Sequence, residues 1–237
     1  MHTEIAIVAR AGRSPRVIAS GGLAVRQTGI DTVHLISTAA TPLGGDTIHM
    51  RVVVEAGASL HVETVAATLA LPARHRIDST MTWTIEVADN ARLFLNPQPT
   101  VVAAGADHRT VTSVAAAATS TVIVAEHAQL GRLEETPDNA SRARWRGSLR
   151  LDVGDAPILR HQLALGGPDS SGHRAVSSVL RYPDERPGDV SPHAYAARLE
   201  LPRPAGVVGA TLTSGLASSA RAARLLCDEL DLAPTAV

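Results

Sequence analysis

The chain has 237 residues with 22 basic and 23 acidic side chains, a formal net charge of −1 and one cysteine, Cys227. This length suits a single large β-rich unit, so we expect one domain over residues 1–237. The near-neutral charge, without a basic run, argues against nucleic acid or an anionic membrane as partner. One cysteine, no signal-peptide pattern and no apolar run of about 18 residues predict a cytoplasmic protein that does not cross a membrane.

A glycine pair stands in front of the first clear strand, in the stretch TPLGGDTIHM at residues 41–50. Period-two alternation follows the pair, whereas a phosphate-binding loop would continue with Lys-Ser/Thr into a helix. We therefore expect Gly44 and Gly45 to form a structural turn, and Gly57 to do so in the next turn along the chain. Asp46, directly after the pair, is left as a candidate functional residue.

Short runs of alternating apolar and polar residues predict β-strands through the middle of the chain. In residues 47–55 apolar side chains occupy every second position, and the same period recurs at 83–87, 149–153 and 159–165. A period of two residues places one face of a strand in the core and the other toward water. Stretches with Gly, Asp and Asn separate these runs, as expected for turns. The sequence therefore predicts a mainly β protein.

An internal echo relates several of these strands to one another. Residues 54–62 align with residues 87–95, an offset of 33, with Gly57 opposite Asn90. A weaker copy at 115–124 follows at a shorter offset. This spacing is too uneven for a strict repeat, and it indicates stacked strand–turn–strand units of irregular length. The units are either the rungs of a distorted β-helix or the hairpins of a sandwich.

About two α-helices are expected beside the strands. Residues 213–232 carry Leu, Ala and Cys at helical spacing, with Ser214 as a plausible N-cap, so one helix lies near the C-terminus. The alanine-rich residues 63–72 are either a second short helix or a strand. Stretches rich in Gly, Pro, Ser and Asp at 166–174 and 182–192 are expected to be surface loops.

Motifs for tight metal binding or for hydrolysis are missing from the sequence. The ten histidines are scattered, without His-x-His or H-E-x-x-H spacing. A weak metal site at His49 and His61, facing each other across the turn at 55–59, is the alternative to two solvated rings. There is no G-x-S-x-G elbow for a serine nucleophile, so a hydrolase is a minor alternative. No tightly bound cofactor is expected.

Glu126 stands out because it directly follows the apolar run at 121–125. If that strand is central, the carboxylate lies in or beside the core, where an unpaired charge is costly. Such an acid is either paired or functional. The alternative is that the strand ends at Ala125 and Glu126 faces solvent.

Three segments together resemble the signature of the urease accessory protein family UreD, also called UreH. Residues 41–71 contain a Gly-Gly-Asp turn, a strand and a Thr-rich strand with an Ala-Thr pair; residues 91–109 contain Pro-Gln-Pro-Thr before an apolar stretch; residues 122–132 contain an apolar strand, Glu and Leu-Gly-Arg. The family usually places a Lys and an aromatic residue after its Ala-Thr pair, whereas Thr68 is followed by the apolar residues 69–71. The chain resembles a divergent member.

The resemblance implies a non-enzymatic scaffold for urease maturation, with a distorted β-helical fold and two helices. Family members bind apo-urease together with UreF and the GTPase UreG, and nickel is thought to pass through an internal polar route. By this resemblance Asp46 and Glu126 match acidic positions that are candidates for the route, with Thr64 and Thr68 nearby. Sparse oxygen ligands would hold nickel only transiently. The alternative to this role is a protein- or carbohydrate-binding β domain without a metal.

Overall fold

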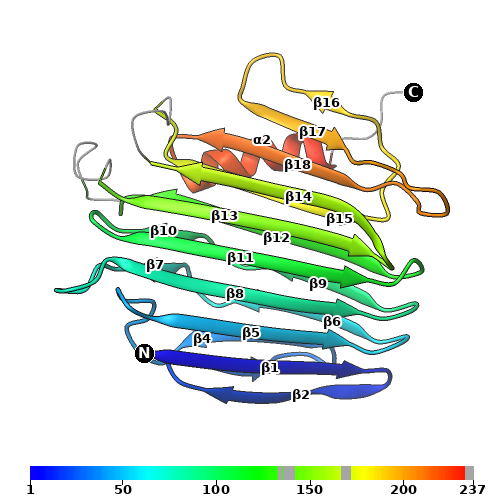
Figure 1. The fold of residues 1–237 in the computed structure, drawn as a ribbon, viewed down its shortest axis with the longest axis horizontal. Coiled ribbons are helices and arrows are strands. Elements are labelled where there is room, and N and C mark those ends of the chain that lie inside the picture. Colours follow the sequence, from blue (N-terminus) through cyan, green and yellow to red (C-terminus); the bar gives the residue numbers. More distant parts are fainter. Residues whose placement is uncertain (133–134, 136–141, 167–171, 233–237) are drawn as a thin grey trace.

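Two β-sheets packed face to face build the molecule in the computed structural model, which describes residues 1–132, 135, 142–166 and 172–232 (Figure 1). The seven-stranded sheet has the spatial order β14 (Ala156–Leu165), β13 (Arg144–Val153), β11 (Asp107–Ala116), β8 (Asp78–Val87), β5 (Thr47–Val54), β1 (His2–Arg10) and β2 (Arg13–Ser20). Its strands β1, β5, β8, β11 and β13 run parallel to their neighbours in this series.

The second sheet has eleven strands. Its main path follows the order β16 (Asp189–Val190), β17 (Ala196–Glu200), β18 (Thr211–Ala217), β15 (Ala175–Tyr182), β12 (Thr121–Leu130), β9 (Arg92–Asn96), β6 (Ser59–Thr64), β4 (Thr32–Ser37) and β3 (Leu23–Gln27). Two short strands, β7 (Thr68–Ala70) and β10 (Thr100–Val102), pair with each other beside β12. Strands β4, β6, β9 and β12 are parallel.

The chain winds as a β-solenoid whose successive strands alternate between the two sheets, which confirms the predicted distorted β-helix. One turn runs through β5, β6 and β7, the next through β8, β9 and β10, and a third through β11 and β12. The register pairs Leu60 with Leu93 and Leu93 with Val122, as the internal echo predicts. Gly57 and Asn90 occupy equivalent corners with φ of 68° and 56°, a backbone conformation that Gly and Asn tolerate.

The core consists of ladders of apolar side chains that run across the stacked turns. In the seven-stranded sheet the register aligns Ile7, Val52, Ile85, Val114 and Leu151, and all five are buried. Parallel strands stacked in register bring the same inward position of each turn into contact with the next. The alternating runs predicted from sequence at 83–87, 149–153 and 159–165 lie in β8, β13 and β14.

The helix expected near the C-terminus is present, but it begins later than predicted. Helix α2 spans Ala220–Leu232, while the preceding residues form β18, which pairs with β15. Ser214 is therefore a strand residue, and Ser219 caps the helix: its hydroxyl accepts a hydrogen bond from the Ala222 amide at 3.3 Å. These residues form a strand because pairing with β15 satisfies their backbone N–H and C=O groups. Helical spacing alone does not show this pairing, so the sequence predicted a longer helix.

The prediction of a second helix at residues 63–72 is wrong, and α2 is the only α-helix among the described residues. Strand β6 ends at Thr64, and β7 pairs in register with β10, Thr68 opposite Thr100. Ladder hydrogen bonds to the next turn outweigh the helix propensity of the alanines. Of the loop expected at 166–174, residues 167–171 lie outside the described residues, and the loop at 182–192 includes the short strand β16.

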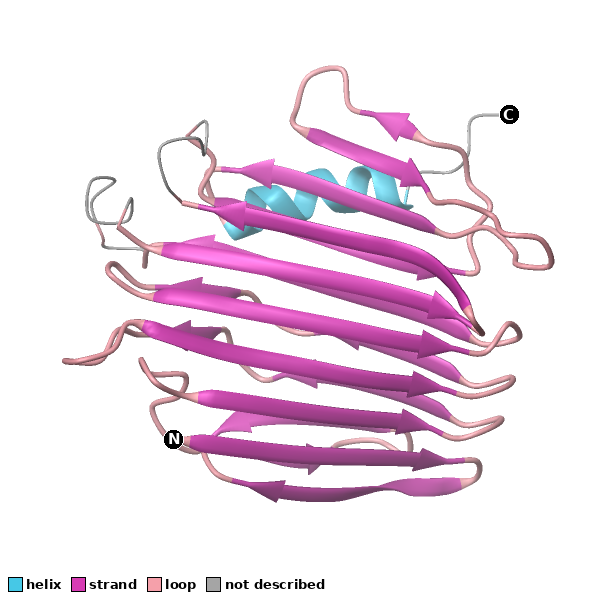
Figure 2. Cartoon of the chain, viewed as in Figure 1, coloured by secondary structure: helices cyan, strands magenta, loops and turns pink. Residues whose placement is uncertain are grey.

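Helix α2 covers part of the outer face of the eleven-stranded sheet, where it packs against β15, β18 and β17 (Figure 2). Arg181 on β15 donates from Nε and Nη2 to both carboxylate oxygens of Asp231 near the end of the helix, at 2.6 to 2.9 Å. Asp231 is buried. Within the described part of the chain, no helix combines the length and apolar character needed to span a membrane.

Candidate functional site

Glu126 lies in the middle of β12, which continues past it to Leu130. The alternative in which the strand ends at Ala125 and Glu126 faces bulk solvent is therefore wrong. Because side chains alternate along a strand, Glu126 points to the same interior face as Val122 and Val124. Its Oε1 is shielded from solvent and has no hydrogen-bond partner among the described residues. Burial raises the pKa of Glu126 to about 8, so the carboxyl group holds its proton at neutral pH.

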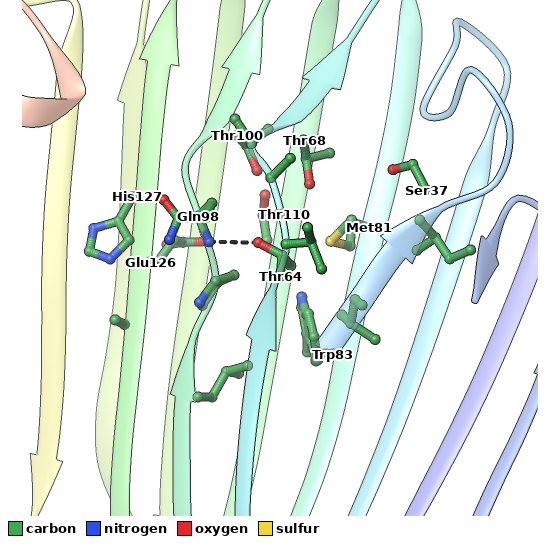
Figure 3. Close-up of a pocket in the computed structure, with 18 of the residues that line it drawn as sticks. Ser37, Thr64, Thr68, Met81, Trp83, Gln98, Thr100, Thr110, Glu126 and His127 are labelled. Atoms are coloured by element: carbon green, nitrogen blue, oxygen red, sulfur yellow. Dashed lines mark hydrogen bonds between the residues drawn. The ribbon is translucent and has the colours of Figure 1, made fainter. Parts of the chain in front are cut away.

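Glu126 borders a cavity of about 220 Å³ between the two sheets (Figure 3). The eleven-stranded sheet contributes residues at the ends of β6, β7 and β10, and the seven-stranded sheet contributes residues of β8 and β11. The polar lining includes the side chains of Thr64, Thr68, Gln98, Thr100, Thr110, Thr112 and Glu126, and the apolar lining includes Met81, Trp83 and Leu95. The structure therefore brings together three of the four route candidates: Glu126, Thr64 and Thr68.

A glycine on the opposite sheet makes room for the carboxylate. An ideal Cβ at Gly147 would lie 2.8 Å from Oε2 of Glu126 and 2.3 Å from Cη2 of Trp145. Such distances are far below van der Waals contact, so a side chain at this position would displace one of the two. Gly147 lies in register with Thr110, which lines the cavity. The site thus depends on a glycine in β13 that is distant from Glu126 in sequence.

Hydrogen bonds hold two of the lining hydroxyl groups. The Thr64 hydroxyl accepts a hydrogen bond from the backbone N–H of Gln98 at 2.8 Å (Figure 3), and the Thr110 hydroxyl accepts one from Trp145 Nε1 at 3.3 Å. Each hydroxyl oxygen still has a lone pair and a proton to offer. The cavity therefore presents neutral oxygen atoms around one ionisable carboxyl group.

His127, the neighbour of Glu126, turns its ring away from the cavity toward the outer side of the sheet (Figure 3). Its Nδ1 is 2.9 Å from the Ser177 hydroxyl and its Nε2 is 3.1 Å from Oδ1 of Asn96. Burial, with a smaller contribution from the Arg224 charge, lowers the pKa of His127 to about 4. The imidazole is thus neutral and its two nitrogens are occupied.

Asp46, the fourth route candidate, is buried in the turn before β5 and is not among the residues that line the cavity. Its carboxylate accepts hydrogen bonds from the Thr41 hydroxyl at 2.9 Å, from the Leu43 amide at 2.8 Å and from the amino group of Met1. Burial opposes ionisation, but these donors outweigh it and lower the pKa of Asp46 below its ordinary value. In this arrangement Asp46 stabilises the turn.

The three turn glycines have conformational or steric reasons for their positions. A Cβ at Gly44 would lie 1.8 Å from the carbonyl oxygen of Arg76, so only glycine allows this close approach of two backbones. Gly45 has φ of 93° and Gly57 has φ of 68°, values in the left-handed region that favours glycine. Gly44, Gly45 and Gly57 thus lie at positions whose backbone geometry favours glycine.

His49 and His61 do not meet across the turn at 55–59. His49 lies on β5 with its ring centroid 5.3 Å from that of His2, while His61 lies on β6 with its ring 5.4 Å from Phe94. Both side chains are exposed, on the outward faces of different sheets. Within the described ranges, no group of three or more His, Cys, Asp and Glu residues is placed to hold a metal ion.

Several lining residues could not be chosen from the sequence alone. Thr110 and Thr112 occupy inward positions of β11, where neighbouring turns carry Met81 and Trp83. Two threonines at apolar positions of an alternating strand are a usable signal of a polar interior. Gly147 gave no such signal, because its role appears only when β13 lies opposite β12.

Comparisons with known proteins identify the family of this chain. A family model described as UreD urease accessory protein matches residues 16–231. The urease accessory protein UreD of Frankia alni is 38% identical over 206 residues, covering 76% of this chain and 67% of that protein. UreD of Streptomyces coelicolor is 34% identical over 217 residues, covering 85% and 84%. UreD of a Parafrankia species is 34% identical over 200 residues, covering 81% of this chain and 63% of that protein.

The chain thus spans about two thirds of the length of the Frankia alni and Parafrankia relatives and most of the Streptomyces coelicolor protein. The family match extends over nearly all of the solenoid and most of α2. The family model and all three relatives are described as urease accessory proteins, which argues against the hydrolase and carbohydrate-binding alternatives. The chain therefore belongs to the UreD family of urease accessory proteins.

Proposed function

We propose that this chain is a maturation scaffold that binds apo-urease together with UreF and the GTPase UreG and gives nickel an internal polar route toward the urease active site. Family membership supports the role in maturation. The observation that supports the route is the unpartnered Glu126 Oε1 beside a cavity with threonine hydroxyls. The proposal includes a cytoplasmic location, where a lone thiol such as the buried Cys227 stays reduced.

The chemistry of the lining suits an ion that has to move on. Nickel binds imidazole nitrogen and thiolate sulfur tightly, whereas hydroxyl and carboxyl oxygens hold it more weakly. The cavity offers Thr64, Thr68 and Glu126, while the ring of His127 points away from it. In the proposed route the arriving cation displaces the Glu126 proton to water and binds the carboxylate that this forms, the hydroxyls replace part of its water shell, and neither set retains it.

Asp46 belongs to the proposal as a buried acid at the beginning of β5. Because its oxygens already accept hydrogen bonds from Thr41 and Leu43, a nickel ion would have to compete with these donors. Asp46→Asn separates the two roles. A lower nickel content in urease with unchanged thermal stability would support the route, whereas a lower stability with normal nickel content would assign Asp46 to the turn alone.

The main test is Glu126→Ala in cells that express this chain with the urease subunits, UreF and UreG. We expect the nickel content per urease active site to fall several-fold while all partners still co-purify, because the substitution enlarges an internal cavity and leaves the surface unchanged. Thr64→Val and Thr68→Val, which replace each hydroxyl with a methyl group of similar size, should give smaller reductions.

The matched control is Glu63→Ala, which removes a carboxylate from the outward face of the strand that carries Thr64. Urease from control cells should contain the normal amount of nickel. Normal nickel content with Glu126→Ala would remove Glu126 from the route, and failure of the wild-type chain to co-purify with any urease component would refute the scaffold.

A further inference from the structure

The outward face of the seven-stranded sheet carries a cluster of four arginines. The 22 Lys and Arg residues of the chain are all arginine. Arg109 lies on β11, Arg146 and Arg150 on β13, and Arg160 on β14, and all four side chains are exposed. The register places Arg109 directly beside Arg146 and Arg150 directly opposite Arg160. These four residues, the arginine face, form two like-charged pairs on neighbouring strands.

Only half of this charge is compensated by described residues. Arg146 donates to both carboxylate oxygens of Asp107 at 3.0 Å, and Arg160 is paired with Asp152. Arg109 and Arg150 form no ion pair with any residue in the described ranges. Like charges directly opposite on adjacent strands destabilise a sheet. No described contact within the chain accounts for these two arginines, which makes this face a candidate for binding.

The surface between the two pairs carries no charged side chain. The intervening row consists of Val111, Ser148 and Gln162 on the same three strands. A shallow depression of about 350 Å³ is lined by residues that include Arg109, Arg146, Ser148 and Gln162. Helix α2 packs on the other sheet, and Figure 1 shows this face toward the viewer without a described element across it.

We propose that the arginine face docks an acidic surface of a protein partner. The planar guanidinium group binds a carboxylate through two parallel hydrogen bonds. A rigid sheet holds the backbones of arginines on adjacent strands about 4.8 Å apart, so their side chains can bind neighbouring carboxylates. The whole chain has a net charge of −1, so it would not attract a long polyanion such as nucleic acid. A local patch of Asp and Glu on a protein meets this face without that general repulsion. This surface is separate from the cavity and does not depend on the nickel route.

The test measures binding of the purified chain to a fluorescently labelled hexaglutamate peptide, which mimics a local acidic patch, at low ionic strength. The wild-type chain should bind, and binding should weaken as salt is added. Arg109→Ser combined with Arg150→Ser removes the two uncompensated charges and should weaken binding about tenfold, since two exposed contacts are lost. The control combines Arg92→Ser with Arg221→Ser, which removes two exposed arginines on the opposite side and changes net charge equally.

The control pair should retain binding within about twofold of the wild type. Equal weakening by both pairs would show a response to net charge alone and overturn the proposal, as would no binding by the wild-type chain. Tighter binding to duplex DNA than to the hexaglutamate peptide would make nucleic acid the occupant and also overturn it. Thermal unfolding tests whether each variant is as stable as the wild type. If the double serine variant is unstable, Arg109→Gln combined with Arg150→Gln replaces it.

Discussion

At the scale of single residues, Glu126 combines a cost in stability with a position that suits function. An acid whose pKa rises to about 8 through burial is held in its neutral form by the fold. Its Oε1 finds no hydrogen-bond partner among the described residues, although Thr64, Thr68 and Thr110 line the same cavity. A leucine here would remove this cost, so the acid has to be explained by what it does in the cavity.

Replacing Glu126 with glutamine should stabilise the protein in a pH-dependent way. Below pH 4.5, the ordinary pKa, the carboxyl group is protonated in both folded and unfolded chains, so wild type and Glu126→Gln should be equally stable. Between pH 4.5 and about 8 the unfolded chain releases the proton while the folded chain keeps it. Wild-type stability should therefore fall behind the variant by up to about 1.4 kcal/mol per pH unit.

Urea unfolding at several pH values measures this difference, which should reach on the order of 3 kcal/mol at pH 7 and level off above pH 8. Glu63→Gln, on the outward face of β6, is the control and should change stability by less than about 0.5 kcal/mol throughout. A stability difference for Glu126→Gln that does not vary with pH would contradict the buried neutral acid.

At the scale of elements, helix α2 is attached to the eleven-stranded sheet by a buried ion pair as well as by apolar contacts. Arg181 reaches both oxygens of Asp231, and Arg186 also contacts this carboxylate at 3.4 Å. The buried residues Ala223 and Cys227 pack on the same side of the helix. A helix of 13 residues is only marginally stable alone, so these contacts decide whether it stays folded.

Asp231→Asn should destabilise the protein by about 3 kcal/mol, because it leaves the Arg181 guanidinium without its buried counter-charge. The control is Glu86→Gln, which breaks the exposed ion pair between Glu86 and Arg51 in the seven-stranded sheet. This change should lower the free energy of unfolding by less than about 1 kcal/mol. Chemical unfolding followed by circular dichroism compares the two variants. Similar losses for both would show that burial of the Asp231 pair contributes nothing extra.

At the scale of the whole molecule, the solenoid is a stack whose ends are closed by antiparallel strands. At one end β2 pairs with β1 and β3 with β4; at the other, β14 pairs with β13 and β15 with β12. Each parallel turn buries its apolar side chains only against the turns beside it. A side chain in the central turn contacts a turn on both sides, so its loss should destabilise the stack most.

Ile85→Ala tests this dependence on the stack. Ile85 lies between Val52 and Val114 in the central ladder and is buried, so the cavity left behind should cost about 2 to 5 kcal/mol. Val111→Ala removes methyl groups from the outward face of the adjacent strand and should cost less than about 1 kcal/mol. Urea unfolding measures both, and comparable losses would contradict a core formed by the inward ladders.

The sequence by itself determined the strands, their inward faces and the corners between them. Period-two alternation and the pairing of Gly57 with Asn90 depend on local geometry and so can be read along the chain. Glu126 was also found locally, because an acid after an apolar run is unusual anywhere. The start of α2 was misplaced because Ser214 could continue a strand or cap a helix, and local spacing does not choose between them.

Only the tertiary structure decided which candidates share a site. Thr64, Thr68 and Glu126 meet because the turns stack in register, while Asp46 is held in a turn outside the cavity lining. Gly147 matters only because the second sheet places Glu126 opposite it. These are contacts between residues far apart in sequence, and they depend on the register of the strands and the packing of two sheets. Periodicity fixes which face a side chain takes, but not which side chain it will meet.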